Sequence, residues 1–230
     1  MKGSAFLSVI PMRKEPSDRS EMVNQILFGE TFEIMEKQEK WSKIKLHHDK
    51  YEGWIDNKQW EISKSEKPKG KNSKVISSVF LKKQHLIFSA GSFVDFEVPG
   101  NKRTLLQTAK LFLQTPYLWG GRTFMGIDCS GFTQIVFRLH DIKLKRDAYQ
   151  QQSQGKKISF ADAATNDLAF FSNAEGKVIH VGIVIRKNNS LKIIHASGNV
   201  RIDKLDASGI FNEETQLYSH HLHSIKRISK

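Results

Sequence analysis

The stretch Thr115–Leu139, TPYLWGGRTFMGIDCSGFTQIVFRL, is the most informative part of this chain because it holds the only cysteine. After that cysteine, apolar residues recur with the spacing of an amphipathic helix that buries one face; they are Phe132, Ile135, Val136 and Leu139. Asp128 precedes this pattern and is expected to be its N-cap. Cys129 then lies in the first helical turn, where the helix dipole and free N–H groups favour a thiolate. We therefore expect Cys129 to be a nucleophile.

Two of the nine histidines lie downstream in β-branched runs. His180 belongs to Lys177–Arg186, KVIHVGIVIR, and His195 to Leu191–Ala196, LKIIHA. Both runs are typical of buried strands, and the polar residues between them predict a turn and an antiparallel hairpin. We expect His180 to be the base for Cys129. His195 would fix its tautomer through a hydrogen bond to the far ring nitrogen.

A purely structural interpretation competes with this one. A lone cysteine is often an inert buried side chain, and a histidine in a strand is usually structural. The order Cys129, His180, His195 after a glycine-rich loop favours catalysis instead, because each part supplies something that a thiol nucleophile needs.

Five segments of the C-terminal half form a set of motifs: Tyr117–Gly121 (YLWGG), Asp128–Phe132 (DCSGF), Arg146–Ala148 with Gln150 or Gln151, Asn166–Phe171 (NDLAFF) and His180–Ile183 (HVGI). They resemble the motifs of the NlpC/p60 cysteine peptidases, which are papain-like enzymes that cut bacterial cell-wall peptides. Asn166 stands where glycine is usual, and asparagine tolerates the left-handed backbone that such a turn implies. The resemblance covers roughly residues 100 to 220 and implies that Cys129, His180 and His195 are catalytic.

The N-terminal part reads as a small β-barrel because short β-rich runs alternate with polar turns. These runs are Ala5–Ile10, Gln25–Leu27, Thr31–Met35, Trp41–Leu46 and Gly53–Ile55. Leu27–Glu30 and Glu52–Ile55 resemble segments of bacterial SH3-like domains. The tryptophans are expected to be core residues rather than a ligand platform; they are Trp41, Trp54 and Trp60.

The predicted fold class is α+β, with an N-terminal SH3-like β-barrel or barrels followed by a papain-like α+β domain with a central antiparallel sheet. We expect an SH3-like barrel at residues 1–62, a linker and a reduced second SH3-like unit at 63–99, and the catalytic domain at 100–230. Ser63–Lys74, rich in lysine, predicts the flexible connection. The second unit is implied by the resemblance and ends with the run Phe93–Val98. Thr104–Leu113 reads as the first catalytic-domain helix.

Composition limits the alternatives. A chain of 230 residues can bury a core without disulfides, and one cysteine excludes an intramolecular disulfide. No apolar run reaches the length of about 18 residues that would predict a membrane span. The start of the chain is a poor signal peptide because charged residues follow its apolar residues quickly. We expect a cytoplasmic protein, or a periplasmic or secreted one if a leader has been removed.

The net charge of +12 raises the question of nucleic-acid binding. No nucleic-acid motif accompanies the charge, so we expect no such partner; a basic surface would equally attract acidic cell-wall peptides. His220, His221 and His223 cluster near the end of the chain without carboxylate or cysteine partners. We expect them to form a solvated edge with no metal site. For the protein as a whole, we expect no cofactor and a monomeric state.

The resemblance also implies the reaction. The bond cleaved would join γ-D-glutamate to a diamino acid, meso-diaminopimelate or lysine, in a murein stem peptide. Cys129 would attack the carbonyl, and its own backbone N–H together with the Tyr117 hydroxyl would hold the oxyanion.

Substrate length follows from the residues that flank the nucleophile. In relatives that carry SH3-like domains, the flanking aspartate and serine bind the free amine of an N-terminal L-alanine, and Asp128 and Ser130 match them. Tyr51 and Glu21 are further candidates for contacting the amine, with ordinary surface positions as the alternative. Such an enzyme would trim released murein peptides during cell-wall recycling.

Two other functions stay open at this point. The protein could be a wall-lytic endopeptidase that acts on intact peptidoglycan. It could also be a catalytically inactive protein that binds cell wall through its SH3-like part. Intact Cys129, His180 and His195 argue against the inactive protein.

Overall fold

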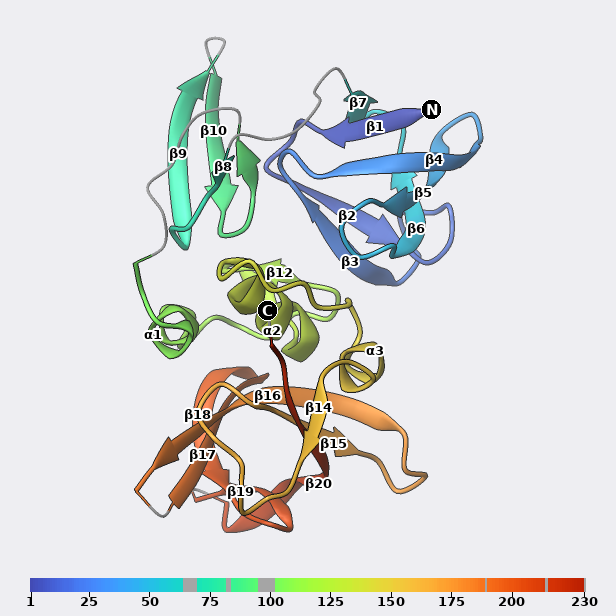
Figure 1. Cartoon of the computed structure of the whole chain (residues 1–230). Coiled ribbons are helices and arrows are strands. Elements are labelled where there is room, and N and C mark those ends of the chain that lie inside the picture. The colour runs from blue at the N-terminus through green and yellow to red at the C-terminus, as the bar shows by residue number, and fades with distance from the viewer. Residues whose placement is uncertain (64–69, 82–83, 95–101, 189, 214, 230) are drawn as a thin grey trace. The chain divides into compact units, whose positions relative to one another are not determined.

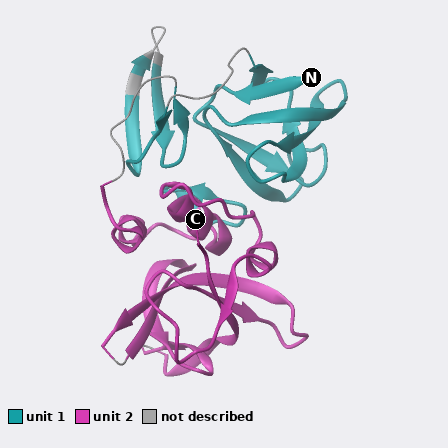
Figure 2. Ribbon diagram, in the orientation of Figure 1, with its two compact units in different colours: residues 1–101, 118–126 teal, residues 102–117, 127–230 magenta. Residues whose placement is uncertain are grey.

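The computed structural model describes residues 1–63, 70–81, 84–94, 102–188, 190–213 and 215–229 (Figure 1). The chain divides into two compact units, each described here by itself (Figure 2). Unit 1 comprises residues 1–101 and 118–126, and unit 2 comprises residues 102–117 and 127–230. The predicted domain boundaries at residues 62 and 99 stay predictions.

Unit 1 is built on an antiparallel seven-stranded sheet with the order β3-β2-β6-β5-β4-β1-β7. Its strands are β1 (Lys2–Ala5), β2 (Val9–Arg13), β3 (Met22–Leu27), β4 (Thr31–Lys37), β5 (Trp41–Leu46), β6 (Glu52–Asp56) and β7 (Trp60–Ile62). The predicted run Ala5–Ile10 was wrong as a single strand, because a bend separates β1 from β2.

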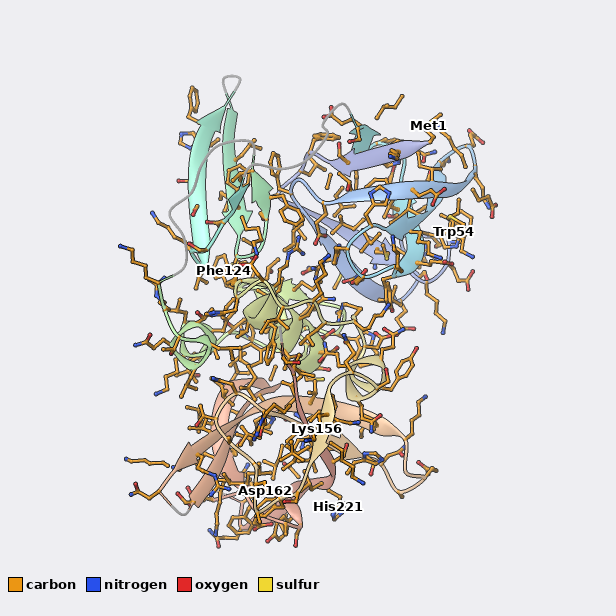
Figure 3. The ribbon with its side chains drawn as sticks, in the orientation of Figure 1. Met1, Trp54, Phe124, Lys156, Asp162 and His221 are labelled. Carbon is orange, nitrogen blue, oxygen red and sulfur yellow. The ribbon has the colours of Figure 1, made fainter. Side chains whose placement is uncertain are left out.

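The core of unit 1 forms where alternating apolar residues share one face of the sheet. Strand β5 shows the pattern, with Ser42, Ile44 and Leu46 buried between more exposed neighbours. The buried cluster consists of Ala5, Ile10, Met12, Ile26, Phe32, Ile44, Leu46, Ile55 and Trp60. Trp54 and Trp60 are buried as predicted, while Trp41 is only half-buried. Figure 3 shows Trp54 on this sheet.

Two short strand pairs follow the seven-stranded sheet in the sequence of unit 1. Strand β9 (Ile76–Leu81) pairs with β10 (Gln84–Ser89), and β8 (Gly70–Lys71) pairs with β11 (Phe93–Val94). Half of the predicted linker, residues 64–69, and the end of the run Phe93–Val98 lie outside the described residues. The second SH3-like unit therefore stays a prediction.

Residues 118–126 belong to unit 1 although they lie between two segments of unit 2 in the sequence. Arg122, in the short strand β12 (Arg122–Thr123), is fully buried, and its guanidinium contacts both carboxylate oxygens of Glu30 at 3.0 Å. It also donates to the carbonyl of Gln25 at 2.7 Å. Gly120 has φ +76°, and a Cβ there would lie 2.5 Å from the carbonyl oxygen of Met22, so only glycine fits.

Unit 2 contains three described helices, α1 (Leu105–Lys110), α2 (Cys129–Arg138) and α3 (Ala148–Gln152). Helix α1 begins as predicted, with Thr104 and Gln107 in a capping box. It ends before the predicted Leu113, and Gln114 has the left-handed φ of 68° that cannot continue a helix. Asp128 caps α2 as predicted.

Helix α2 differs from its prediction in one respect. The predicted apolar stripe is buried, but all the remaining residues from Cys129 to Arg138 are buried as well. The polar side chains on the second face are hydrogen-bonded inside the protein: Thr133 donates to Gln151 at 2.7 Å, and Gln134 donates to the carbonyl of Leu144 at 3.1 Å. The helix therefore buries both of its faces rather than one, because internal hydrogen bonds replace those to water.

Unit 2 also contains an antiparallel sheet with the strand order β14-β20-β15-β16-β17-β18-β19. The strands are β14 (Lys156–Ile158), β15 (Leu168–Ser172), β16 (Val178–Lys187), β17 (Ser190–Ser197), β18 (Asn199–Leu205), β19 (Gly209–Asn212) and β20 (Leu217–Arg227). Because β20 also pairs with β19, the sheet closes into a barrel-like ring (Figure 1). The predicted hairpin of β16 and β17 is confirmed. Asn166, just before β15, has the predicted left-handed backbone with φ 80°.

Candidate active site

Cys129 is the first residue of α2 and is 6% exposed. The Asp128 side chain accepts a hydrogen bond from the Gly131 N–H at 2.6 Å, which fixes the start of the helix at the cysteine. The backbone N–H groups of Val181 and Ser130 donate toward the sulfur. Because Val181 follows His180 in β16, the sulfur lies beside the strand that carries the predicted base.

The predicted thiolate was wrong for the free protein. Burial, and after it the neighbouring Asp128 carboxylate, raise the pKa of the Cys129 thiol to about 12. The N–H groups of Val181 and Ser130 and the charge of Arg146 act in the opposite direction but are outweighed. The position at the helix start does not ionise the sulfur, because the free energy of removing a thiolate from water exceeds the stabilisation by the helix dipole.

Three side chains of the sheet form a hydrogen-bonded relay. Nε2 of His180 and Nδ1 of His195 lie 2.8 Å apart, which confirms the predicted contact between the two rings. Nε2 of His195 lies 2.8 Å from Oδ2 of Asp203 in β18. Arg201 contacts the same carboxylate, with its Nη2 2.9 Å from Oδ1. His180 and His195 are 5% and 1% exposed, so the relay is shielded from water.

The relay fixes which nitrogen of His180 is free. Burial raises the pKa of Asp203, but hydrogen bonds from His195 and Arg201 outweigh it and hold that pKa below its ordinary value, so the carboxylate only accepts. Nε2 of His195 must therefore carry a proton, and in a neutral ring Nδ1 is then an acceptor. His180 donates from Nε2 to this acceptor, which leaves its Nδ1 without a proton and able to act as a base.

Sheet register explains why the two rings meet. Gly182 pairs with His195 across β16 and β17, and His180 lies two residues before Gly182 on the same face. A Cβ at Gly182 would lie 2.8 Å from Cβ of His195 and 2.6 Å from Cδ1 of Ile193. Because glycine has no side chain at this position, the imidazole of His195 has room to contact His180.

Burial also sets the protonation state of His180. It lowers the pKa of the imidazole well below its ordinary value, and charges on His195 and His220 would lower it further. At neutral pH the free protein therefore contains an imidazole base beside a neutral thiol.

Asp128 and Ser130 form a second buried cluster with Arg146. Nη1 and Nη2 of Arg146 lie 3.0 and 2.5 Å from the two carboxylate oxygens of Asp128, and Nη1 also donates to Oγ of Ser130 at 3.0 Å. Arg146 is 1% exposed. The carboxylate predicted to bind a substrate amine thus already has a charge partner inside the protein.

Tyr117 is half-buried and lies close enough to Cys129 to interact with it electrostatically. Burial raises the pKa of its hydroxyl well above the ordinary value, and the charges of Cys129 and Asp128 raise it further. The hydroxyl therefore keeps its proton at neutral pH and can donate a hydrogen bond. Its predicted role in holding an oxyanion stays a prediction.

Glu21 and Tyr51 lie in unit 1. Glu21 accepts a hydrogen bond from Nε1 of Trp119 at 2.7 Å and lies 3.6 Å from Nζ of Lys14. Tyr51 packs against the core of the barrel, and its backbone N–H donates to Asp49. Both have internal partners, and their predicted contact with substrate stays a prediction.

Sequence reasoning missed Asp203 and Arg201 and misjudged His220. Asp203 had only a weak signal, namely its place in the strand pattern NVRIDKL directly after the run that carries His195. His220 was predicted to lie on a solvated edge, but its ring stacks on that of His180 with centroids 4.1 Å apart. His221 and His223 are exposed as predicted, and Figure 3 shows His221 in unit 2.

The described residues contain no group of three His, Cys, Asp or Glu side chains arranged to hold a metal ion. Within the same residues, no helix has the length and apolar character to cross a membrane.

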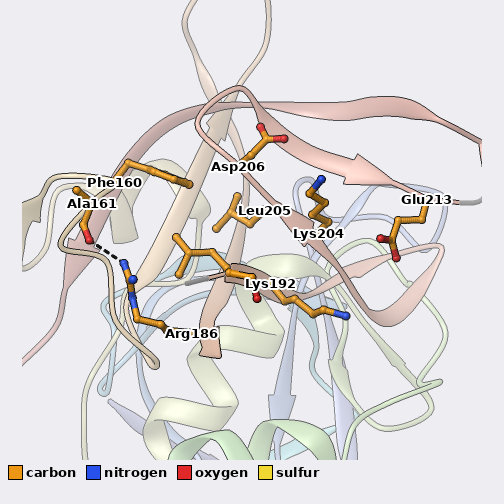
Figure 4. A pocket seen from close by; sticks show the side chains of 10 residues that line it. Phe160, Ala161, Arg186, Lys192, Lys204, Leu205, Asp206 and Glu213 are labelled. Atoms are coloured by element: carbon orange, nitrogen blue, oxygen red, sulfur yellow. Dashed lines mark hydrogen bonds between the residues drawn. The ribbon is translucent and has the colours of Figure 1, made fainter. Parts of the chain in front are cut away.

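A cavity of about 550 Å³ lies elsewhere in unit 2 and includes none of the residues of the relay (Figure 4). Its wall includes Lys192 and Lys204, which pair across β17 and β18, and Arg186. The guanidinium of Arg186 already donates to the carbonyls of Ala161 and Ala163. These features assign no ligand to the cavity.

Comparison with known families finds a match for each of two regions of the chain. Residues 114–219 match the NlpC/P60 family, and residues 12–59 match the bacterial dipeptidyl-peptidase SH3 domain. A crystal structure of an NlpC/P60 family protein from Bacillus cereus superposes with a TM-score of 0.82 over 99% of both chains. Its sequence identity of 20% shows likeness of fold alone.

Two curated relatives are more similar in sequence over a shorter stretch. A gamma-D-glutamyl-L-lysine dipeptidyl-peptidase of Bacillus cereus is 35% identical over 111 residues, which are 47% of this chain and 33% of that protein. The protein of the same name from Bacillus subtilis is 40% identical over 88 residues, which are 37% of this chain and 30% of that protein. The aligned region thus spans about a third of the length of these relatives. The chain therefore carries a region that matches a bacterial SH3 domain, followed by a region that matches the NlpC/P60 family.

Proposed function

We propose that this chain is a cysteine peptidase that hydrolyses the amide bond between γ-D-glutamate and a diamino acid in murein stem peptides. The observation that carries the proposal is the buried relay from His180 through His195 to Asp203, beside a cysteine at the start of a helix. The names of the two Bacillus relatives support the choice of bond. The diamino acid would be meso-diaminopimelate or lysine.

The first half of the reaction forms a thioester. Nδ1 of His180 takes the proton of the Cys129 thiol as the sulfur attacks the carbonyl carbon, and the carbonyl electron pair moves onto oxygen. The backbone N–H of Cys129 and the hydroxyl of Tyr117 donate to this oxyanion. When the C–N bond breaks, His180 passes its proton to the leaving amine.

The second half releases the dipeptide. Nδ1 of His180 accepts a proton from water as the water oxygen attacks the thioester, and the proton returns to sulfur when the C–S bond breaks. His195 holds the imidazole in one tautomer throughout, because its Nδ1 accepts only from Nε2 of His180. Asp203 stabilises any positive charge that spreads along the relay.

The substrates we propose are released peptides with a free N-terminal L-alanine. The protein would act as a monomer in the cytoplasm, where it would recycle cell-wall peptides. A dipeptidyl-peptidase needs such an end, and Asp128 and Ser130 flank the nucleophile where it would bind. Because Arg146 already balances the charge of Asp128, selectivity for the amine would come from hydrogen-bond geometry more than from net charge.

The test compares L-Ala-γ-D-Glu-diaminopimelate with its N-acetylated form, using mass spectrometry to follow release of the dipeptide. We expect cleavage of the free peptide, little of the acetylated one, and none by Cys129→Ala. Equal turnover of both forms would reject the free-amine requirement. Release of peptides from intact peptidoglycan, with neither short peptide cleaved, would favour a wall-lytic endopeptidase. Retained cleavage by Cys129→Ala would reject the cysteine mechanism.

A further inference from the structure

His220, in β20, contributes a ring to the immediate surroundings of His180. The two imidazoles stack with centroids 4.1 Å apart and an angle of 22° between their planes. His195 approaches His180 differently, edge-on at 84° with centroids 5.0 Å apart. One partner of His180 therefore covers a ring face, while the other holds a ring nitrogen.

Irregular pairing in the sheet brings His220 to this place. Strand β15 lies between β20 and β16, and its pairing shifts register on both sides near Phe171. Such bulges redirect side chains and are common near active sites. Phe171 pairs with His180, and its ring lies 5.8 Å from that of His180 and 6.0 Å from that of His220. The ring of Phe171 thus contacts both stacked imidazoles within the sheet.

We propose that His220 is a positioning residue, whose ring covers one face of the His180 imidazole and holds its plane in line with His195. This inference rests on the proposed peptidase function for its catalytic meaning. The stacked contact restricts rotation of His180 about its side-chain bonds, whereas the hydrogen bond to His195 restrains one nitrogen. Together they leave Nδ1 with one orientation.

The charge on each ring agrees with this role. Burial, and after it the charge of His195, lower the pKa of His220 to about 4, although Asp203 acts in the opposite direction. Its ring is therefore neutral at neutral pH, when His180 gains a proton from Cys129 during attack. The face of a neutral aromatic ring tolerates an adjacent cation, whereas a second cation 4.1 Å away would repel it.

Two substitutions separate stacking from hydrogen bonding and titration. Phenylalanine in His220→Phe keeps a ring face but has no nitrogen, and His220→Ala removes the ring. We expect kcat of His220→Ala to fall by about ten- to hundredfold with little change in KM, as for a mispositioned catalytic group. His220→Phe should lose less than about threefold. His221→Ala, an exposed neighbour in the same strand, is the matched control and should behave as the unchanged protein.

A second readout does not depend on the substrate. Imidazole NMR of ¹⁵N-histidine-labelled protein, with His180 assigned from a His180→Gln sample, follows its protonation with pH. We expect His180 to titrate well below 6.5 in the unchanged protein and in His220→Phe, and closer to 6.5 in His220→Ala, where water reaches the bared ring face. The same titration in His220→Ala as in the unchanged protein would overturn the inference. Equal loss of kcat in the alanine and phenylalanine variants would also overturn it. Failure of the unchanged protein to cleave any peptide would reject only the proposed function.

Discussion

Asp203 sets the direction in which the imidazole relay moves a proton. Its carboxylate accepts from Nε2 of His195, so His195 must accept from His180 rather than donate to it. In Asp203→Asn, the amide can instead donate to His195, and the relay then has two tautomers of similar energy. We expect kcat/KM to fall on the order of a hundredfold, less than the roughly 10⁴-fold loss seen when an aspartate contacts the catalytic imidazole directly.

The control for this substitution is Asp206→Asn, three residues further along the chain. The carboxylate of Asp206 accepts a hydrogen bond from Tyr218 and not from a histidine. It should leave peptide turnover unchanged. Both variants need unfolding midpoints near that of the unchanged protein, measured by circular dichroism. Full activity of a folded Asp203→Asn would show that the tautomer is fixed without the carboxylate.

The protonation state of Cys129 gives a prediction about chemical reactivity. With a pKa of about 12, the free thiol should react slowly with iodoacetamide at neutral pH, and its rate should keep rising with pH beyond 10. An ordinary cysteine would approach its maximum rate near pH 9 to 10. Because the chain has one cysteine, the adduct seen by mass spectrometry reports this site alone. A rate that levels off below pH 8 would contradict the buried neutral thiol.

Prediction from sequence succeeded at residues whose pattern is local. Cys129 follows a cap, and His180 and His195 stand in adjacent β-branched runs, so a hairpin between those runs sufficed to bring the rings together. His220 could not be placed this way, because its contact with His180 depends on two bulges around Phe171. The protonation of Cys129 was misjudged for a related reason, since burial depends on the whole domain rather than on its helix.

At the scale of elements, the start of α2 depends on a buried ion pair. Asp128 caps the helix and binds Arg146 through both oxygens. Arg146→Met would leave a buried carboxylate without its charge partner, which costs about 3–5 kcal/mol in such sites. Asp128→Asn should cost less in capping, because an asparagine oxygen still accepts from Gly131, but it leaves the guanidinium without a carboxylate.

A double-mutant cycle measures this coupling. We expect the double variant Asp128→Asn/Arg146→Met to be more stable than the sum of the two single losses predicts, by about 1–3 kcal/mol, because neither charge is then left unpaired. Chemical denaturation followed by circular dichroism provides the free energies. Additive losses would mean that the two side chains stabilise α2 independently.

At the scale of the whole chain, residues 118–126 are the feature that sequence reading could not find. They lie within the NlpC/P60 match at residues 114–219, yet they pack in unit 1 with the barrel. The contact depends on Arg122 and Glu30, which are 92 positions apart, and no local pattern marks such a pair.

Glu30→Gln tests how strongly the barrel holds this segment. The substitution keeps an oxygen that can accept from Arg122 but leaves the buried guanidinium without its carboxylate, so we expect unit 1 to lose about 3–5 kcal/mol of unfolding free energy. All four tryptophans lie in unit 1, so denaturation followed by tryptophan fluorescence reports this unit alone. The control Glu52→Gln removes an exposed pair with Lys45 and should cost no more than about 1 kcal/mol. Equal losses in the two variants would mean that the buried pair contributes no more than a surface one, and that the backbone contacts of residues 118–126 suffice to hold them.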